Sequence, residues 1–392
     1  MKEIVTELIP APQIIEIEPA LGCNLRCLMC HVPHMKVKPV FLDIELLERQ
    51  TRNLTGIHVI IGSEFEPTIH PNFDALLRLA VKRSWRVDLL TNGVNLDRYD
   101  PSLLRDVRFH VFNVSFDGAS KESFEFSRRG ASYEKVLTNT IRVAELVRNN
   151  GAYTGISATM MRSNLAETPS MVRKWNDHGF DVIRLHMAQV RAVQGPLFNQ
   201  SLYPIYNQLK DVLDETAALV VRDKLRIGVA AGYYGSSLFE KPPGGKVLDA
   251  TFSSSNSQHR HVPRVRQSIQ LGHWPGMPVR CKSPFVYARI RWDGIIDLCQ
   301  NSNFSVGSLY DNTFDEIWNG SLVRSVRDSI KSAPRICKEC DYFNFCINYS
   351  ELDIRDKKSH FSSGIVERVE VNRDMLSRQA SQAKPRASLE DV

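Results

Sequence analysis

Residues 13–30 read QIIEIEPALGCNLRCLMC, and the rest of the chain is best interpreted outward from this stretch. Residues 13–18 alternate isoleucine with other residues, which predicts a strand. The strand leads into a loop that holds Cys23, Cys27 and Cys30. Three thiols spaced CxxxCxxC can ligate three irons of a [4Fe–4S] cluster and leave the fourth iron open to a small molecule. A zinc knuckle or three unrelated buried thiols are the alternatives, but zinc sites usually carry CxxC pairs.

The eight cysteines fall into two groups, with none between Cys30 and Cys281. A disulfide framework usually belongs to a short secreted chain, and no apolar run of signal-peptide type follows Met1. We therefore expect two metal sites in a protein of the reducing cytoplasm. The second group consists of Cys281, Cys299, Cys337, Cys340 and Cys346.

Length and composition restrict the class of protein. A chain of 392 residues with 43% hydrophobic content can bury a large core and is long enough for two domains. The net charge of +6 is mild, and no block of Lys and Arg is interleaved with aromatic residues. No stretch approaches the roughly 18 apolar residues of a membrane helix. The sequence thus predicts no nucleic-acid and no membrane partner.

Strand and helix patterns alternate between residues 12 and 190. Such alternation predicts parallel strands joined by right-handed crossovers, with the chemistry at the carboxyl ends of the strands. The predicted strands are residues 13–18, 57–62, 86–91, 109–115, 153–161 and 181–187, and the predicted helices are residues 42–53, 73–83, 102–106, 133–149 and 167–178.

The cysteine loop and the six α/β units together resemble the radical SAM superfamily. The resemblance implies an α/β fold with a partial (β/α)6 barrel of TIM type. It also implies that the open iron binds S-adenosylmethionine (SAM), whose reductive cleavage gives a 5′-deoxyadenosyl radical that abstracts hydrogen from carbon. An external electron donor such as flavodoxin or ferredoxin would supply the electron. The alternative from another class is an iron–sulfur electron carrier or scaffold, which a SAM cleavage assay would distinguish.

Several strand ends carry residues that this resemblance assigns to SAM. After the second strand, family members have a glycine-rich GGE-P stretch that binds the SAM amino group. This chain departs from it, because Ser63, Glu64 and Phe65 occupy the glycine region before Glu66. Glu66 is the expected amino-group ligand and Glu64 is the alternative. The other expected SAM contacts are Met29, Asn92 of a Thr-Asn-Gly turn, Ser115, Asp117, Arg128 and Arg129 for the carboxylate, Thr159 and Met187.

The C-terminal cysteines lie around a predicted hairpin and helix. Residues 285–299 alternate on both sides of Asp293-Gly294, which predicts a β-hairpin, and residues 314–332 predict a helix. The pattern CX12GX4C followed by CX2CX5C resembles the SPASM and twitch auxiliary-cluster domains, including that of 2-deoxy-scyllo-inosamine dehydrogenases. The resemblance implies a small α+β domain with a second [4Fe–4S] cluster, for which zinc is the alternative metal. Its implied ligands are Cys281, Cys299, Cys337 and Cys340.

Cys346 is left without a cluster, and Ser350 stands where a full SPASM domain has another cysteine. A radical formed at a carbinol carbon can be oxidised to a ketone through the second cluster, or it can accept hydrogen on the opposite face and invert. A thiol is the usual hydrogen donor for inversion. We therefore name Cys346 as the expected catalytic residue and expect epimerisation ahead of dehydrogenation.

Few residues precede the first strand, so we expect no peptide-binding module there. This favours a sugar-like or aminocyclitol natural product over the alternative, a ribosomal peptide. The expected domains are a barrel at residues 12–190, a linker or lid at 191–280 and the auxiliary-cluster domain at 281–346. A polar C-terminal extension at 347–392, partly disordered, would follow.

Overall fold

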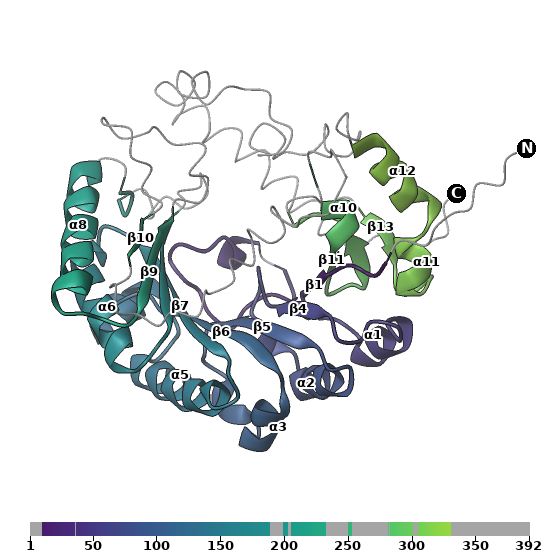
Figure 1. Ribbon diagram of the computed structural model, residues 1–392, viewed down its shortest axis with the longest axis horizontal. Coiled ribbons are helices and arrows are strands. Elements are labelled where there is room, and N and C mark those ends of the chain that lie inside the picture. Colours follow the sequence, from purple (N-terminus) through teal and green to yellow (C-terminus); the bar gives the residue numbers. More distant parts are fainter. Residues whose placement is uncertain are drawn as a thin grey trace, which may run out of the picture.

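The computed structural model describes residues 10–35, 37–188, 199–202, 205–232, 250–252, 281, 283–300 and 305–330. An eleven-stranded sheet organises these residues, and helices lie along its outer side (Figure 1). The strand order is β10-β9-β8-β7-β6-β5-β4-β1-β11-β12-β13. Parallel strands form its middle and antiparallel strands its C-terminal end. This is the predicted α/β fold, a partial TIM-type barrel followed by a smaller C-terminal part.

The structure confirms all six predicted barrel strands. Each pairs in parallel with its neighbour, so their carboxyl ends meet at one edge of the sheet. The short strands β2 (Ala20–Leu21) and β3 (Val40–Phe41) pair separately on either side of the cysteine loop. The barrel strands are β1 (Ile14–Ile17), β4 (His58–Ile61), β5 (Arg86–Thr91), β6 (Phe109–Ser115), β7 (Tyr153–Met160) and β8 (Val182–Met187).

The predicted helices between these strands are also present. Side-chain caps start several of them: Asp43 accepts from Glu45 N and Leu46 N, and Ser132 accepts from Lys135 N. The structure adds α4 (Lys121–Ser127), which the sequence analysis had not predicted. The predicted helices are α1 (Ile44–Gln50), α2 (Phe73–Lys82), α3 (Pro101–Asp106), α5 (Tyr133–Arg148) and α6 (Thr168–Asp177).

The α/β repeat continues beyond residue 190. Helix α8 (Tyr206–Arg222) buries Leu209, Leu213 and Val220, and strand β9 (Gly228–Gly232) pairs in parallel with β8. Strand β10 (Ala250–Phe252) then pairs antiparallel with β9. The described part of residues 191–280 therefore extends the barrel sheet, in a region that the sequence predicts as a linker or lid.

Alternation along the strands separates a core face from an inner face. Ile15 and Ile17 of β1 are buried in the main apolar cluster with residues of the outer helices. Because successive side chains point to opposite faces, Glu16 and Glu18 lie on the inner face of the barrel. Both glutamates are almost fully buried. The inner face thus carries acidic side chains close to the cysteine loop.

The C-terminal strands join the barrel sheet directly. The predicted hairpin is confirmed as β11 (Tyr287–Ile290) and β12 (Ile295–Asp297), and β13 (Ser305–Ser308) adds a third strand. Strand β11 pairs in parallel with β1, with Ile14 opposite Tyr287. Helix α10 (Ser283–Val286) precedes the hairpin. The barrel and the C-terminal part therefore share one sheet.

The single helix predicted for residues 314–332 is wrong. The structure has two helices there, α11 (Phe314–Trp318) and α12 (Ser321–Ser329). Gly320 between them is extended, with φ −68° and ψ 163°, and acts as the N-cap of α12. The apolar periodicity continued across the break, and this hid it from a pattern-based prediction. Of the helices in the described ranges, none is long and apolar enough to cross a membrane.

Candidate functional site

The cysteine loop follows β1 at the carboxyl end of the parallel strands. Backbone hydrogen bonds attach it to the C-terminal end of α4 and the residues that follow: Arg26 N donates to Arg129 O at 2.9 Å, and Leu28 N donates to Ser127 O at 2.8 Å. Two sulfurs accept backbone N–H groups within the loop, Cys23 Sγ from Leu25 and Cys30 Sγ from Val32, both at 3.4 Å. The loop is therefore held in one conformation by its own backbone and by its neighbour.

The three thiols are close enough to influence one another. Burial raises the pKa of Cys23 to about 11 and that of Cys27 to about 12, and the charge of Cys30 adds to both shifts. Burial also acts on Cys30, but the hydrogen bond and charge of His31 outweigh it and lower the pKa of Cys30. A bound metal keeps such thiols deprotonated. Three neighbouring thiols, of which Cys27 is buried and Cys23 and Cys30 are partly buried, fit the open-site cluster that their spacing predicts.

Glu66 lies near Cys23 and joins the loop after β4 to the loop after β5. Its buried carboxylate accepts hydrogen bonds from Thr91 Oγ1 and Asn92 N, both at 2.7 Å, and from Thr68. Asn92 in turn donates to Asn24 Oδ1 at 2.8 Å and lies 3.6 Å from Cys23 Sγ. Burial raises the pKa of Glu66 despite these donors. The structure thus brings the expected SAM contacts Glu66 and Asn92 together with Cys23.

Glu64, the alternative amino-group ligand, has different neighbours. Its carboxylate lies 3.3 Å from His31 Nε2 and 3.8 Å from Arg289 of β11. The loop starts at Gly62, whose φ of +79° suits glycine. A Cβ at Gly62 would lie 2.5 Å from Pro67 and 2.6 Å from the Leu90 carbonyl oxygen. One glycine is therefore needed at the turn, and the next three residues carry side chains.

Sequence reasoning missed Glu18, the residue that holds this loop. Its carboxylate accepts the backbone N–H groups of Ser63 at 2.7 Å, Glu64 at 2.8 Å and Phe65 at 3.3 Å. Burial raises the pKa of Glu18 well above its ordinary value, and the charges of Glu16 and Glu64 add to the shift. The sequence does offer one indication of this role, since Glu18 is an acidic residue at the end of an apolar strand just before the cysteines.

Asp117 and Arg128 form a buried ion pair, with Arg128 Nε 2.7 Å from Asp117 Oδ2. Asp117 Oδ1 also accepts the backbone N–H of Thr159 at 2.6 Å. Arg128 lies near the cysteine loop, where its charge lowers the pKa of Cys27 against the larger effect of burial. Arg129 is exposed and contacts the Phe126 ring. Of the two arginines, the structure brings only Arg128 to the thiols.

The remaining predicted SAM contacts are more widely spread. Met29 is partly buried and packs against Leu28, Met161 and Ala188. Ser115 and Thr159 are partly exposed at the carboxyl ends of β6 and β7. Met187 belongs to the main apolar core. Their contact with SAM stays a prediction.

Two of the C-terminal cysteines lie in the described part of the chain, and both are partly exposed. Ser283 Oγ, two residues after Cys281, donates to the carbonyl oxygen of Leu298 at 2.5 Å, next to Cys299. This bond draws the two cysteine segments together. Cys337, Cys340 and Cys346 lie outside the described residues, so their roles as ligands and hydrogen donor stay predictions.

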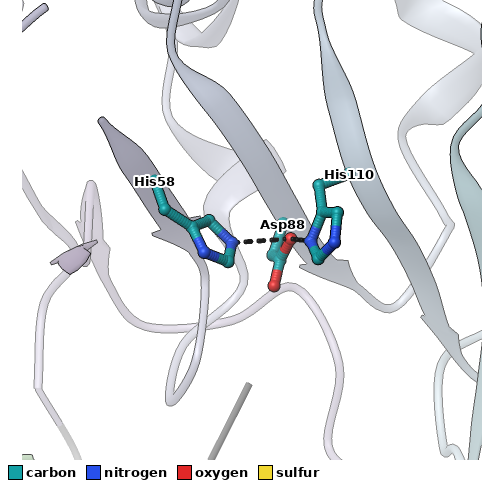
Figure 2. A group of neighbouring side chains, drawn as sticks. All are labelled: His58, Asp88 and His110. Atoms are coloured by element: carbon teal, nitrogen blue, oxygen red, sulfur yellow. Dashed lines mark hydrogen bonds and ion pairs between the residues drawn. The ribbon is translucent and has the colours of Figure 1, made fainter. Parts of the chain in front are cut away.

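Another cluster on the inner face offers atoms that metals bind. His58, Asp88 and His110 come from β4, β5 and β6 and point toward one another (Figure 2). His58 Nε2 and His110 Nδ1 each lie 2.9 Å from Asp88 Oδ1. Arg86 Nη2 lies 3.3 Å from His58 Nδ1. A guanidinium can only donate, so His58 Nδ1 accepts and Nε2 carries the proton toward Asp88.

A metal-bound histidine would instead donate from its second ring nitrogen. We therefore assign these three residues to a hydrogen-bonded network that joins three strands. Burial alone would raise the pKa of Asp88, but hydrogen bonds from His110 and His58 lower it. The stabilisation that ionised Asp88 gives to the folded chain is present above the ordinary pKa of aspartate. It is lost only as the pH falls through the lowered pKa of Asp88.

Asp88→Asn should thus destabilise the chain by about 1–3 kcal/mol, because a charged acceptor for the buried His58 and the partly buried His110 is lost. The loss should be undiminished at a pH of about 5, where Asp88 is still ionised. Urea unfolding followed by tryptophan fluorescence measures the free energy of unfolding at each pH, with Asp74→Asn at an exposed position as control. A loss that disappears between neutral pH and this point would contradict the assignment.

Family models match both parts of the chain. Residues 17–174 match the model of the Radical SAM superfamily, and residues 281–341 match SPASM, an iron–sulfur cluster-binding domain. The first match contains the cysteine loop, Glu66, Asn92 and Arg128, and the second contains the hairpin and four cysteines. The cofactors of these two domains are SAM, its [4Fe–4S] cluster and additional iron–sulfur clusters.

Individual relatives are distant. Fe-coproporphyrin III synthase of Methanosarcina barkeri is 21% identical over 340 residues, which is 83% of this chain and 79% of that protein. The antilisterial bacteriocin subtilosin biosynthesis protein AlbA of Bacillus subtilis is 23% identical over 43% of this chain and 38% of its own length. The crystal structure of Streptococcus suis SuiB bound to S-adenosylmethionine has a TM-score of 0.58 at 13% identity, covering 86% of this chain and 72% of that one. The similarity to the SuiB structure supports the fold described above.

Proposed function

We propose that this chain, a radical SAM enzyme with a C-terminal iron–sulfur cluster-binding domain, abstracts hydrogen from a polar substrate in its barrel and oxidises the resulting radical through the second metal site. The observation that carries the proposal is the convergence of three thiols with Glu66, Asn92 and Arg128 at the carboxyl ends of the strands. When bound, the cofactors supply the one-electron cleavage of SAM and the hydrogen abstraction. The chain orients the reactants and excludes water.

Polar side chains on the inner face support a polar substrate. Arg184 and His186 of β8 and Ser157 of β7 are partly exposed there. Arg184 donates to Asn113 Oδ1 at 3.2 Å, and Asn113 donates to Ser157 Oγ at 2.9 Å. Hydroxyl, carboxylate or amide groups of a substrate would find hydrogen-bonding partners along this face.

A sugar-like or aminocyclitol substrate with a carbinol carbon is our first candidate, and it fits this polar face. The relation to Fe-coproporphyrin III synthase supports a tetrapyrrole as the second candidate. The relation to AlbA, a bacteriocin biosynthesis protein, supports a peptide as the third. An external donor such as flavodoxin or ferredoxin would deliver the electron for SAM cleavage.

Oxidation is favoured over epimerisation by one contact. Gln300, the residue after Cys299, hydrogen-bonds Ser63 of the loop before Glu66. The second metal site would therefore lie near the first, where it can accept an electron from a substrate radical. Epimerisation with Cys346 as hydrogen donor is the alternative. A product two hydrogens lighter indicates oxidation, whereas solvent deuterium at one carbon without that mass loss indicates inversion.

Anaerobic reconstitution followed by reduction with dithionite tests the proposal. We expect about eight irons per chain, four for each cluster, and formation of 5′-deoxyadenosine and methionine from SAM. Each substrate class is then added in turn, and the one that increases 5′-deoxyadenosine formation is retained. Zinc in the thiol sites, or iron-loaded protein that leaves SAM intact, would overturn the assignment.

A further inference from the structure

Three consecutive residues of one loop each contact the C-terminal hairpin. Ser63 Oγ accepts a hydrogen bond from Gln300 Nε2 at 2.5 Å. Glu64 lies 3.8 Å from Arg289 Nη1. The Phe65 ring packs edge-on against Trp292, with ring centres 4.9 Å apart. We call residues 63–65 the bridge loop.

The bridge loop also touches the cysteine site of the barrel. The backbone N–H of Glu66, which follows it, donates to Gly22 O at 3.1 Å, immediately before Cys23. Glu64 lies 3.3 Å from His31, immediately after Cys30. Glu18 holds the backbone of all three loop residues. A small displacement of this loop would therefore be felt at the first metal site.

Arg289 connects the hairpin to Gln300 at this end of the contact. Arg289 is 4% exposed and donates to Asp297 Oδ2 at 2.7 and 3.1 Å. Its Nη1 donates to the carbonyl oxygen of Gln300 at 3.0 Å. Gln300 directly follows Cys299, so any change in the position of Cys299 is passed to Gln300. The residues between the two cysteine sites thus form one continuous chain of hydrogen bonds and ion pairs.

Glycines could not make these contacts. The chain has serine, glutamate and phenylalanine where its sequence resemblance leads one to expect glycines, and each of these side chains reaches the hairpin. The three side chains therefore connect the two sites, while Glu18 holds the loop backbone.

We propose that the bridge loop couples the C-terminal metal site to SAM binding, with the Ser63–Gln300 hydrogen bond as the principal contact. This inference rests on the proposed function, since it takes SAM as the ligand of the first site. Metal binding at Cys281 and Cys299 fixes Gln300, which fixes Ser63 and the loop before Glu66. SAM then binds to a loop that is already ordered, so less of its binding energy is spent on ordering it.

A double-mutant cycle tests the contact. SAM affinity is measured by anaerobic calorimetry on reconstituted wild type, Ser63→Ala, Gln300→Ala and the double variant, all with iron content verified. We expect each single variant to bind SAM about fivefold more weakly, and the double variant to bind no more weakly than the singles. Ser305→Ala, at an exposed position of the neighbouring strand β13, is the control and should bind SAM like wild type. If the double variant instead bound SAM about 25-fold more weakly, the two single effects would be independent and the proposed coupling would be wrong.

Cys281→Ala provides the second arm. It should lose the C-terminal cluster, keep the N-terminal one and bind SAM about fivefold more weakly. In the Ser63→Ala background it should have no further effect. Unchanged SAM affinity in Cys281→Ala would contradict the proposal. If this variant does not fold, the double-mutant cycle of Ser63 and Gln300 tests the coupling by itself. A wild type whose reduced cluster shows no change in its electron paramagnetic resonance spectrum on adding SAM would instead refute the proposed function.

Discussion

Cys27→Ala should remove the N-terminal cluster and abolish SAM cleavage. Cys27 is the middle cysteine of the loop and is only 9% exposed, so water cannot readily replace its sulfur as a ligand. With two thiols left, a [4Fe–4S] cluster has no stable attachment at this loop. The iron content should fall by about four per chain, and 5′-deoxyadenosine should fall to the level without enzyme. Iron analysis and chromatography of the quenched reaction measure both.

Cys281→Ala is the matched control for that experiment, because it removes a thiol from the other group. It should also lose about four irons, but it should still cleave SAM when SAM is saturating. SAM cleavage by Cys27→Ala at the wild-type rate would show that these three thiols are not the site of the chemistry. The paired variants therefore assign each cluster to its cysteines.

Glu18→Ala should weaken SAM binding at least about tenfold without removing either cluster. The substitution leaves three neighbouring backbone N–H groups, those of Ser63, Glu64 and Phe65, without their buried acceptor. Each such orphaned group costs about 1–3 kcal/mol, so the loop should rearrange toward other acceptors. Calorimetric titration with SAM, at equal iron loading, measures the effect.

Glu18→Gln refines this experiment, since the amide oxygen can still accept from part of the loop. Its loss of affinity should be clearly smaller than that of Glu18→Ala. Glu48→Ala on α1 removes a partly exposed carboxylate and serves as control. Equal affinity in wild type and Glu18→Ala would mean that the loop keeps its shape without the carboxylate, and the role assigned to Glu18 would be wrong.

The barrel was predictable because its strands and helices have strong, regular patterns. Residues 109–115 were predicted as a strand and form β6 over the same residues, since buried β-branched and aromatic side chains leave little choice there. The break at Gly320 was missed because apolar positions on both sides keep a helical spacing. Strand β9 was missed because its sequence, GVAAG, is short and small, and only its place beside β8 makes it a strand.

The cysteine site was accessible from sequence because ligand spacing is local. Cys23, Cys27 and Cys30 lie within one loop, and Asn92 and Glu66 follow strand ends that a parallel sheet brings together. Glu18 was not found because its role depends on the pairing of β1 with β4, which brings it to residues 63–65. Arg289 and Gln300 were not found because their roles depend on the pairing of β1 with β11, which no local pattern reveals. The same holds for the His58–Asp88–His110 network, whose members come from three separate strands.

The pairing of β1 with β11 has a consequence for synthesis of the chain. Strand β1 lies between β4 and β11, so among the described strands its second neighbour is made only when the ribosome reaches residue 287. Until then one edge of the first strand has open N–H and C=O groups, which can pair with another chain. The nascent barrel is therefore exposed to wrong pairing through most of translation. A barrel expressed without the hairpin keeps that exposed edge permanently and is prone to aggregate.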